Sequence, residues 1–245
     1  LINRTSYMDT LTSLIGVPDI KVITGIRRSG KSKLLEALRD YVEANLSNSN
    51  VIHINYNLDE FENLLEYHAL LAYVKEHRVS GKQNFLLIDE VQMCDGFERA
   101  INSLHASEQY DIFITGSNAF LLSSDLGRTF EIEVFPFSFE EYRLYGDEGE
   151  VDRDFDEYAR TGGMSGSYPY PLQEQRYQYL SNVFKTLIVR DIVQRHNVRN
   201  ESALLRIADY MMDNVSNITS ARNITDILNA DGLKITNKTV GTYMG

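Results

Sequence analysis

The sequence is poor in cysteine and proline, lacks tryptophan and contains no long apolar run. Its one cysteine, Cys94, cannot form an internal disulfide or a cysteine-based zinc site, and such scarcity is typical of a reducing compartment. No stretch approaches the ~18 uninterrupted apolar residues of a membrane-spanning helix, and the N-terminus lacks the pattern of a secretory signal peptide. We therefore predict a cytoplasmic protein that has no membrane partner.

The residues that are present are typical of a folded protein, because 43% of the 245 are hydrophobic and 24% are charged. The formal net charge of −11 is unevenly spread, since residues 131–160 contain eleven acidic and three basic side chains. Residues 195–245 are close to neutral, with six basic and five acidic side chains. This balance argues against a nucleic-acid-binding protein that depends on a globally positive field. Any DNA contact would have to come from the C-terminal part.

Apolar runs rich in β-branched residues alternate with amphipathic helical segments in the first half of the chain. Such an alternation builds a parallel sheet that helices cover on both faces. The run at 84–91 is apolar on both faces, which predicts a central strand. The expected strands are 20–25, 51–56, 84–91, 111–117 and 130–136, and the expected helices are 31–44, 64–79, 97–106 and 118–126. We predict a five-stranded α/β domain that ends near residue 137.

Beyond residue 137 the strand signal stops and helical periodicity takes over. Residues 179–195 carry apolar side chains at spacings of three and four, which predicts a long helix with one buried face. The glycines and prolines of 161–171 predict a loop or hinge. Residues 218–229 and 234–243 have the pattern of a helix, a turn and a second helix. We therefore expect a helical C-terminal half.

Residues 25–32, GIRRSGKS, have the spacing of a phosphate-binding loop between a strand and a helix, and we refer to them as the phosphate loop. Glycines let the backbone wrap until its N–H groups face an anion, and the N-terminus of the following helix adds positive potential. Lys31 is suited to reach the β- and γ-phosphates of ATP, and the Ser32 hydroxyl to bind Mg²⁺. The alternative is a glycine-rich turn with an exposed lysine. The residues expected to contact the nucleotide are Gly25, Ile26, Arg27, Arg28, Ser29, Gly30, Lys31, Ser32, Lys33 and Ser117.

The apolar strand at 84–91 delivers two acids, Asp89 and Glu90, at its C-terminal end. Alternating side chains send them to different sides of the strand, which predicts different roles. Asp89 is suited to hold Mg²⁺ through its water shell, and Glu90 to polarise the water that attacks the γ-phosphate. The alternative is a solvated strand end or a helix cap. Because a whole strand and helix separate the pair from the phosphate loop, the arrangement is similar to that of ATPases with a carboxylate-activated water, rather than to that of kinases and GTPases.

Two further positions are candidates for catalysis. Ser117 or Asn118, which follow the fourth expected strand, could orient the attacking water, and a helix-capping role is an alternative compatible with this one. Arg128 precedes the fifth expected strand, where an arginine could stabilise charge on the transferred phosphoryl group in its own subunit or in a neighbour's. Its alternative is a surface salt bridge. The expected catalytic residues are Lys31, Glu90, Asn118 and Arg128, and the expected Mg²⁺ ligands are Ser32 and Asp89.

Five stretches together resemble one known family: GIRRSGKS, LLIDE, TGSNAFLLS, the Gly127–Arg128 pair and PFSFEEY at 136–142. Over nearly its whole length the chain is similar to prokaryotic AAA-type ATPases in which a P-loop domain precedes a C-terminal domain of unknown function. The resemblance implies an AAA-like P-loop NTPase core, a helical lid or linker region and a partial winged-helix-like segment. The corresponding divisions are 1–137, 138–195 and 196–245.

The resemblance also implies roles for single residues. Lys31, Ser32, Asp89 and Glu90 match the family's ATP site, and Arg128 matches its recurrent Gly-Arg pair. Arg190–Asp191 looks like a family pair on the long helix, near the nucleotide. The family normally continues well past residue 245, so we expect this sequence to be truncated. Gly162–Gly163 usually leads into a proline in the family, whereas Met164 follows here.

Three function classes remain open. The first is an Mg²⁺-dependent ATPase whose hydrolysis moves the helical part against the sheet. The second is an ATP-binding switch that turns over slowly and acts on DNA or on a protein partner through the C-terminal segment. The third is a phosphotransferase, which Glu90 disfavours because a kinase does not need a water-activating base. ATP and ADP are the expected ligands, a homo-oligomer and a protein client are compatible with the sequence, and the near-neutral C-terminal charge favours protein packing over DNA binding.

Overall fold

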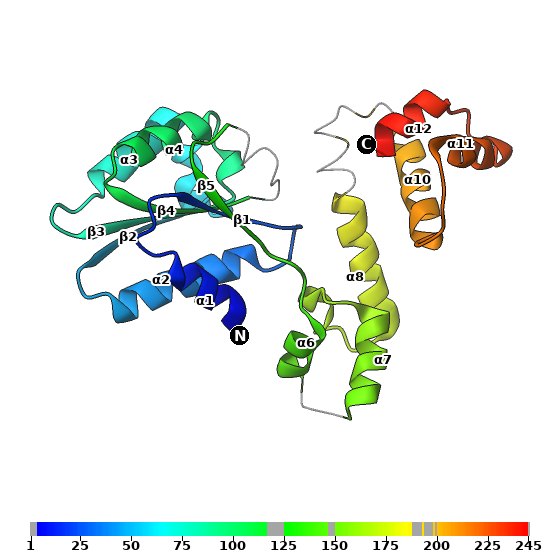
Figure 1. The fold of residues 1–245 in the computed structure, drawn as a ribbon, viewed down its shortest axis with the longest axis horizontal. Helices are drawn as coiled ribbons and strands as arrows, with labels where there is room; N and C mark the ends of the chain where they lie inside the picture. The colour runs from blue at the N-terminus through cyan, green and yellow to red at the C-terminus, as the bar shows by residue number, and fades with distance from the viewer. Residues whose placement is uncertain are drawn as a thin grey trace. The chain divides into compact units, whose positions relative to one another are not determined.

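A computed structural model of the protein describes residues 4–116, 125–146, 150–187, 193, 198 and 200–244. The chain divides into two compact units, Leu1–Tyr177 and Gln178–Gly245 (Figure 1). Within the described residues, every helix is too short or too polar to span a bilayer.

The first unit is built on a five-stranded sheet whose strands all run parallel, in the order β2-β3-β4-β1-β5 (Figure 1). The strands are β1 (Ile20–Thr24), β2 (Ser49–Asn55), β3 (Gln83–Asp89), β4 (Tyr110–Thr115) and β5 (Thr129–Glu133). The predicted five-stranded α/β domain is confirmed. Strand β3 lies inside the sheet, between β2 and β4, so the prediction of a central strand is confirmed.

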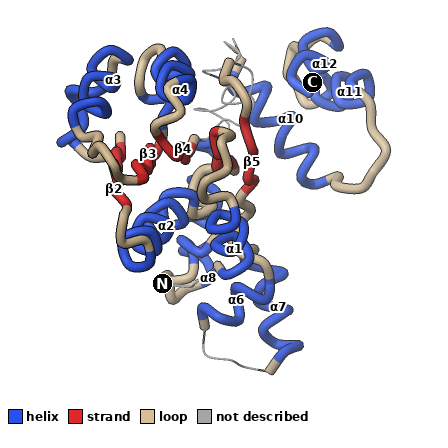
Figure 2. Tube along the Cα trace, turned by 60° about the vertical axis from the view of Figure 1, so that its left-hand side comes forward, coloured by secondary structure: helices blue, strands red, loops and turns tan. Residues whose placement is uncertain are grey.

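Helices cover both faces of this sheet (Figures 1 and 2). They are α1 (Thr5–Ser13) and α2 (Lys31–Asn45) on one face and α3 (Tyr67–Glu76) and α4 (Phe97–Ala106) on the other. Because side chains alternate along a strand, β3 contributes to two separate cores. Phe85 and Leu87 pack with α1 and α2, while Leu86 and Ile88 pack with α3 and α4. All four side chains are fully buried, which explains the uninterrupted apolar run of this strand.

Two helices of the first unit differ from the sequence expectation. The helix expected at 64–79 is shorter in the structure, where α3 begins at Tyr67 because the Glu66 side chain accepts a hydrogen bond from the His68 N–H (2.9 Å) and so caps it. A short 3-10 helix, η1 (Asp59–Leu64), precedes it. Helix α1 was not expected, since Leu11 is its one fully buried apolar residue. Most of the helix expected at 118–126 lies outside the described residues.

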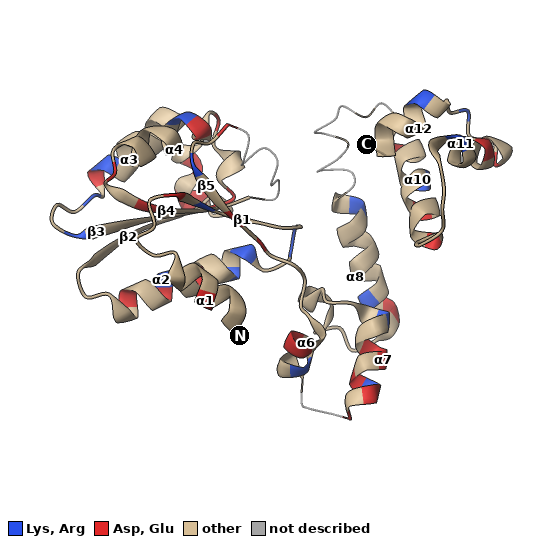
Figure 3. Ribbon diagram, viewed as in Figure 1, with Lys and Arg blue, Asp and Glu red and all other residues tan. Residues whose placement is uncertain are grey.

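Helices replace strands after β5, as the sequence predicts. They are α6 (Phe139–Tyr145), α7 (Val151–Thr161), the 3-10 helix η3 (Ser165–Ser167) and α8 (Gln173–Thr186). Ser138 begins α6 with a reciprocal cap, in which its hydroxyl accepts from the Glu141 N–H (3.2 Å) and the Glu141 carboxylate accepts from the Ser138 N–H (2.9 Å). Helices α6 and α7 carry six of the 35 acidic side chains of the chain (Figure 3). The long helix expected at 179–195 begins earlier, at Gln173, and part of it lies outside the described residues.

The second unit contains α10 (Glu201–Asp213), α11 (Ala221–Ala230) and α12 (Asn237–Met244) around a small apolar core. The expected helix-turn-helix corresponds to α11 and α12. The Asn229 side chain fixes the turn, because its amide donates to the Ile235 carbonyl (3.0 Å) and its carbonyl accepts from the Ile235 N–H (2.8 Å). The described residues of this unit include no strand, and the winged-helix-like segment stays a prediction.

Candidate functional site

The phosphate loop leaves the carboxyl end of β1 and enters α2 through three residues with positive φ. These are Gly25 (131°), Arg28 (67°) and Gly30 (101°). A Cβ atom at Gly25 would lie 2.2 Å from the Val134 carbonyl oxygen, so a glycine is required there. Gly30 is the N-cap of α2 and offers no side chain to the first helical N–H groups. The loop therefore combines a tightly turned backbone with an uncapped helix N-terminus, where an anion is favoured.

Lys31 lies inside this loop rather than in solvent. Its side chain is buried, and its ammonium nitrogen Nζ donates to the carbonyl oxygens of Gly25 (2.9 Å) and Ile26 (3.2 Å). The exposed-lysine alternative therefore does not hold for Lys31. Lys33 is different, because its ammonium pairs with the Glu36 carboxylate (2.6 Å) on the exposed surface of α2. Lys31 and Lys33 thus occupy opposite environments.

Asp89 ends β3 with a carboxylate that is 1% exposed. Its oxygen Oδ1 accepts a hydrogen bond from the hydroxyl of Thr115, the last residue of β4. Its other oxygen, Oδ2, is buried without a hydrogen-bond partner among the described residues. A buried carboxylate oxygen of this kind costs free energy unless a further group binds it. Asp89 therefore offers one hard oxygen ligand, and the Ser32 hydroxyl in the first turn of α2 offers a second, so this pair of donors fits Mg²⁺.

Glu90 turns away from Asp89, because its backbone leaves the strand with a positive φ of 56°. Its N–H donates to the Thr115 hydroxyl oxygen (3.0 Å), and its carboxylate accepts from the side-chain amide of Gln92 (2.5 Å). Thr115 thus binds both acids of the pair. The side chains of Asp89 and Glu90 have separate partners, and their separate roles stay a prediction.

The phosphate loop and the acid pair lie along one edge of the sheet. Strand β4 pairs with both β1 and β3, and all three strands run parallel. Their carboxyl ends therefore share an edge, where open α/β sheets bind their ligands. The geometry brings Lys31, Asp89 and Glu90 to this edge, with Thr115 between them. Ser117, Asn118 and the Arg190–Asp191 pair lie outside the described residues.

Arg128 lies at the opposite edge of the sheet. Its carbonyl oxygen accepts from the N–H of Ile20 at the amino end of β1 (3.0 Å), and its guanidinium pairs with Asp19 (2.7 Å). The phosphate loop begins five residues further along β1, a distance of about 16 Å that exceeds the reach of an arginine side chain. The expectation that Arg128 acts in the site of its own chain is therefore wrong. The salt-bridge alternative is present, and a role in a neighbouring subunit stays a prediction.

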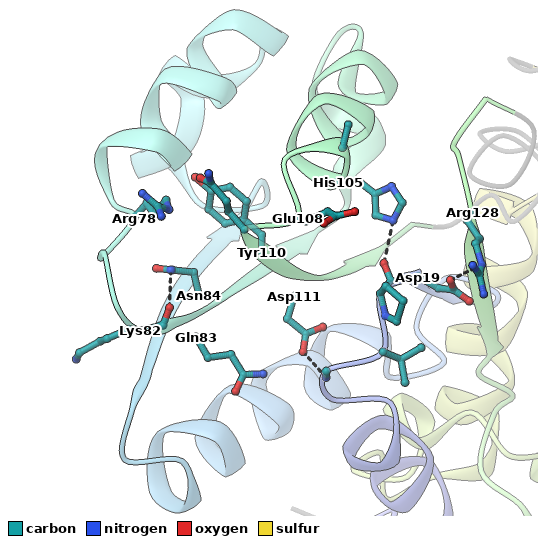
Figure 4. Close-up of a pocket in the computed structure, with 15 residues that line it drawn as sticks. Asp19, Arg78, Lys82, Gln83, Asn84, His105, Glu108, Tyr110, Asp111 and Arg128 are labelled. Atoms are coloured by element: carbon teal, nitrogen blue, oxygen red, sulfur yellow. Dashed lines mark hydrogen bonds and ion pairs between the residues drawn. The ribbon is translucent and has the colours of Figure 1, made fainter.

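A cavity of about 800 Å³ also lies at this opposite edge (Figure 4). It is formed by the loops that precede the strands, and its charged lining residues carry both signs: Asp19, Arg78, Lys82, Glu108, Asp111 and Arg128. Asp111 is held by Lys21 and by the Gly16 N–H (2.7 Å), and His105 contacts the Pro18 carbonyl (2.8 Å). Because the charges are mixed and several are already paired, the cavity shows no preference for an anion.

In the part of the chain that the structure describes, Cys94 and the histidines do not form a second site. Burial raises the pKa of the Cys94 thiol, so the thiolate that a nucleophile needs is disfavoured. Among the residues that the structure describes, no three His, Cys, Asp or Glu side chains are grouped closely enough to hold a metal ion.

Residues 17–143 match the protein family described as AAA domain. The chain belongs to this AAA family. Residues 152–245 match a second family, described as a domain of unknown function (DUF8612). The AAA match covers the sheet, the phosphate loop and the acid pair, and the second match covers α7 and the helices that follow it. This agrees with the resemblance inferred from the motifs.

Two curated relatives of this AAA chain are both described as uncharacterized proteins. One, from Haemophilus influenzae, is 31% identical over 257 residues, which is 100% of this chain and 64% of the relative. The other, MJ1544 from Methanocaldococcus jannaschii, is 25% identical over 247 residues, or 92% of this chain and 53% of the relative. The chain thus spans roughly half to two thirds of the length of the relatives it matches.

The fold is also similar to a solved structure, the Walker-type ATPase paby2304 of Pyrococcus abyssi. The TM-score is 0.63 at 17% sequence identity, over 100% of this chain and 88% of that one. At this identity the likeness concerns the fold, which is that of an AAA-type P-loop protein.

One residue that packs against the phosphate loop has no motif to mark it. Arg4, immediately before α1, is 6% exposed and donates to the carbonyl oxygen of Ser29 (2.9 Å). Sequence reasoning missed it, because a single arginine ahead of an unrecognised helix carries no spacing signal.

Proposed function

We propose that the chain binds ATP with Mg²⁺ and hydrolyses it to ADP and phosphate. The observation that carries this proposal is the buried Asp89 oxygen without a hydrogen-bond partner in the described part of the chain, at the same sheet edge as the Lys31 loop. A phosphate-binding loop and a hard oxygen ligand at one edge are what a nucleotide–Mg²⁺ complex needs.

Each residue of the site then has a separate task. The N–H groups of the phosphate loop and the ammonium of Lys31 bind the β- and γ-phosphates, and for this Lys31 exchanges the carbonyls of Gly25 and Ile26 for phosphate oxygens. Ser32 and Asp89 hold the Mg²⁺ ion. When bound, this ion neutralises charge on the phosphate oxygens.

Glu90 is the base of the proposed reaction. The oxygen of a water molecule forms a bond to the γ-phosphorus while the bond from that phosphorus to the β–γ bridging oxygen breaks. ADP leaves with the bonding electron pair, and Glu90 takes the proton of the water. Ser117 and Asn118 remain candidates for orienting this water. We further propose that hydrolysis moves the helical region that follows β5.

The test is phosphate release by the purified protein. We expect release of one phosphate for each ADP formed, dependent on Mg²⁺ and abolished by EDTA. ATP binding without release would instead indicate the slowly turning switch. Transfer of the γ-phosphate to another molecule would indicate a phosphotransferase. Either result would contradict the proposed hydrolysis.

Arg128 supports a second part of the proposal, catalysis across a subunit interface. Its side chain is 77% exposed and cannot reach the phosphate loop of its own chain, so a neighbouring copy is the one ATP site within its reach. We expect Arg128→Ala to lower the rate of phosphate release at least about tenfold, as the loss of an arginine that stabilises the transferred phosphoryl group does. Mixing Arg128→Ala with an inactive Glu90→Gln variant is expected to restore activity, since one interface in the mixture is intact.

The matched control for this experiment is Arg78→Ala, which removes another arginine that lines the same cavity. It is expected to retain its activity without mixing. Wild-type activity of Arg128→Ala, or no recovery in the mixture, would refute the role across an interface.

A further inference from the structure

Arg4 is a charged side chain in the interior of the first unit. It is 6% exposed, and a buried guanidinium is tolerated only where its N–H groups have acceptors. An arginine with a purely structural role needs hydrogen-bond acceptors, but any neighbouring residues can supply them. The acceptors of Arg4 come from three separate parts of the first unit, and one of these is the phosphate loop.

The guanidinium donates four hydrogen bonds. Nη1 donates to the Ser29 carbonyl (2.9 Å), and Nη2 donates to the Phe135 carbonyl (2.9 Å). Nε and Nη2 bind the two carboxylate oxygens of Glu141 (2.7 and 3.0 Å). Paired bonds of this kind fix both the position and the plane of the guanidinium. The rings of Tyr7 and Phe137 add cation–π contacts, with their centres 4.3 and 5.2 Å from the Arg4 carbon Cζ.

These acceptors connect the phosphate loop to the helical region. Ser29 precedes Gly30, the N-cap of α2, and Glu141 lies in the first turn of α6. Phe135 lies in the segment that joins β5 to α6. One rigid side chain therefore contacts the loop, the connecting segment and the first helix beyond the sheet.

The connecting segment is itself held on both sides. The Phe135 N–H donates to the Tyr7 hydroxyl oxygen of α1 (3.1 Å). The Phe137 N–H donates to the Gly163 carbonyl (2.8 Å), and the Phe137 carbonyl accepts from the Tyr158 hydroxyl of α7 (2.8 Å). Because the segment has little freedom, a shift of Arg4 is transmitted to α6 rather than absorbed between them.

The bond to Ser29 also orients a candidate phosphate ligand. In a planar trans peptide the C=O and the following N–H point in opposite directions. Since Arg4 holds the Ser29 carbonyl, the Gly30 N–H points away from Arg4. This N–H is one of the phosphate-loop donors in the proposed function. Arg4 thus sets the direction of a donor that it does not contact.

We propose that Arg4 is a positioning residue for ATP hydrolysis, which orients the phosphate loop through Ser29 and couples nucleotide binding to helix α6 through Glu141. This inference rests on the proposed function, because it assigns to the loop the role of a nucleotide site. It explains why a buried arginine, rather than an apolar side chain, fills the space between the loop and α6.

The test compares Arg4→Met with Arg4→Lys and with Arg39→Met, a matched control on α2 whose arginine pairs with exposed Asp40 (2.7 Å). Methionine keeps most of the apolar stem but donates no hydrogen bond. We expect Arg4→Met to lower kcat and to weaken ADP binding, each about tenfold, because a charge-assisted bond to the loop is lost. Arg4→Lys should recover part of the ADP affinity, since an ammonium can still reach one carbonyl, but not the paired bonds to Glu141.

Hydrogen exchange reports the coupling directly. In the wild-type protein and in Arg39→Met, ADP is expected to slow amide exchange both in the phosphate loop and in α6. In Glu141→Gln, which keeps the bond from Arg4 to Ser29 but removes the carboxylate, ADP should still slow exchange in the loop and no longer in α6. This variant also keeps the test valid if Arg4→Met does not fold.

The outcomes separate the two proposals. Wild-type protein that binds ADP but releases no phosphate from ATP would refute the proposed hydrolysis, while the exchange data would still test the coupling. Either of two results would overturn the inference for Arg4. One is a folded Arg4→Met variant with wild-type kcat, ADP affinity and amide exchange. The other is a Glu141→Gln variant in which ADP still slows amide exchange in α6.

Discussion

Glu90→Gln is expected to bind ATP as tightly as the wild-type protein and to release phosphate at least about 100-fold more slowly, the usual loss when a general base is removed. The amide has the shape of the carboxylate but cannot take a proton from water. Its oxygen can still accept from the Gln92 side chain, which binds Glu90 at 2.5 Å, so the local fold should be kept. Calorimetry with ATP measures the binding, and a continuous phosphate assay measures the release.

Glu108→Gln is the matched control for this variant. Glu108 is an exposed acid in the cavity at the amino ends of the strands, remote from the phosphate loop. The Glu108→Gln variant should release phosphate at the wild-type rate. If Glu90→Gln also hydrolyses ATP normally, another group activates the water. If it loses ATP affinity instead, Glu90 contributes to binding and is not the base.

The sheet could be predicted from the sequence because its signals are local. Strand β3 is an unbroken apolar run because both of its faces are covered, and α2 begins within the GKS motif, at Lys31. The order of the strands in the sheet was not predictable in the same way. Strand order depends on how β1 inserts between β4 and β5, and no periodicity within a strand records which neighbours it pairs with.

The same difference between local signals and tertiary contacts applies to the candidate site. The phosphate loop is a contiguous motif, so Lys31 and its glycines could be found from spacing alone. The hydrogen bond from Thr115 to Asp89 joins strands 26 residues apart, and those from Arg4 join it to residues 25, 131 and 137 positions away. Contacts of this range follow from the tertiary fold, and a single sequence does not encode them as a pattern.

Arg128 shows where chain order misleads. It follows the fourth strand and the candidate water-orienting residues in sequence, and the sequence alone left open whether it acts in its own subunit or in a neighbour's. In a parallel sheet, however, a residue immediately before a strand lies at the amino edge, and β5 pairs with β1 from Thr129 onward. The direction of β5 alone therefore places Arg128 opposite the phosphate loop, whatever the strand order.

Lys31→Ala is expected to weaken the binding of both ATP and ADP at least about 100-fold. Two charge-assisted hydrogen bonds to phosphate oxygens are lost, and at about 1.5 kcal/mol or more each they account for such a change. The substitution also leaves the carbonyls of Gly25 and Ile26 without the ammonium that now binds them, which loosens the loop before any nucleotide arrives. Calorimetric titration with each nucleotide measures the effect.

Lys33→Ala separates this effect from a general loss of positive charge. Lys33 lies two residues away on the same helix, and its side chain pairs with Glu36 on the exposed surface. The Lys33→Ala variant keeps the backbone N–H through which this residue, in the first turn of α2, can contact a phosphate, so it should bind both nucleotides with wild-type affinity. Unchanged affinity of Lys31→Ala, in a variant whose thermal unfolding shows it to be folded, would refute the assignment of residues 25–32 as a nucleotide site. Equal losses in the two variants would show that the loop attracts nucleotides by net charge alone, without the specific position of the buried ammonium.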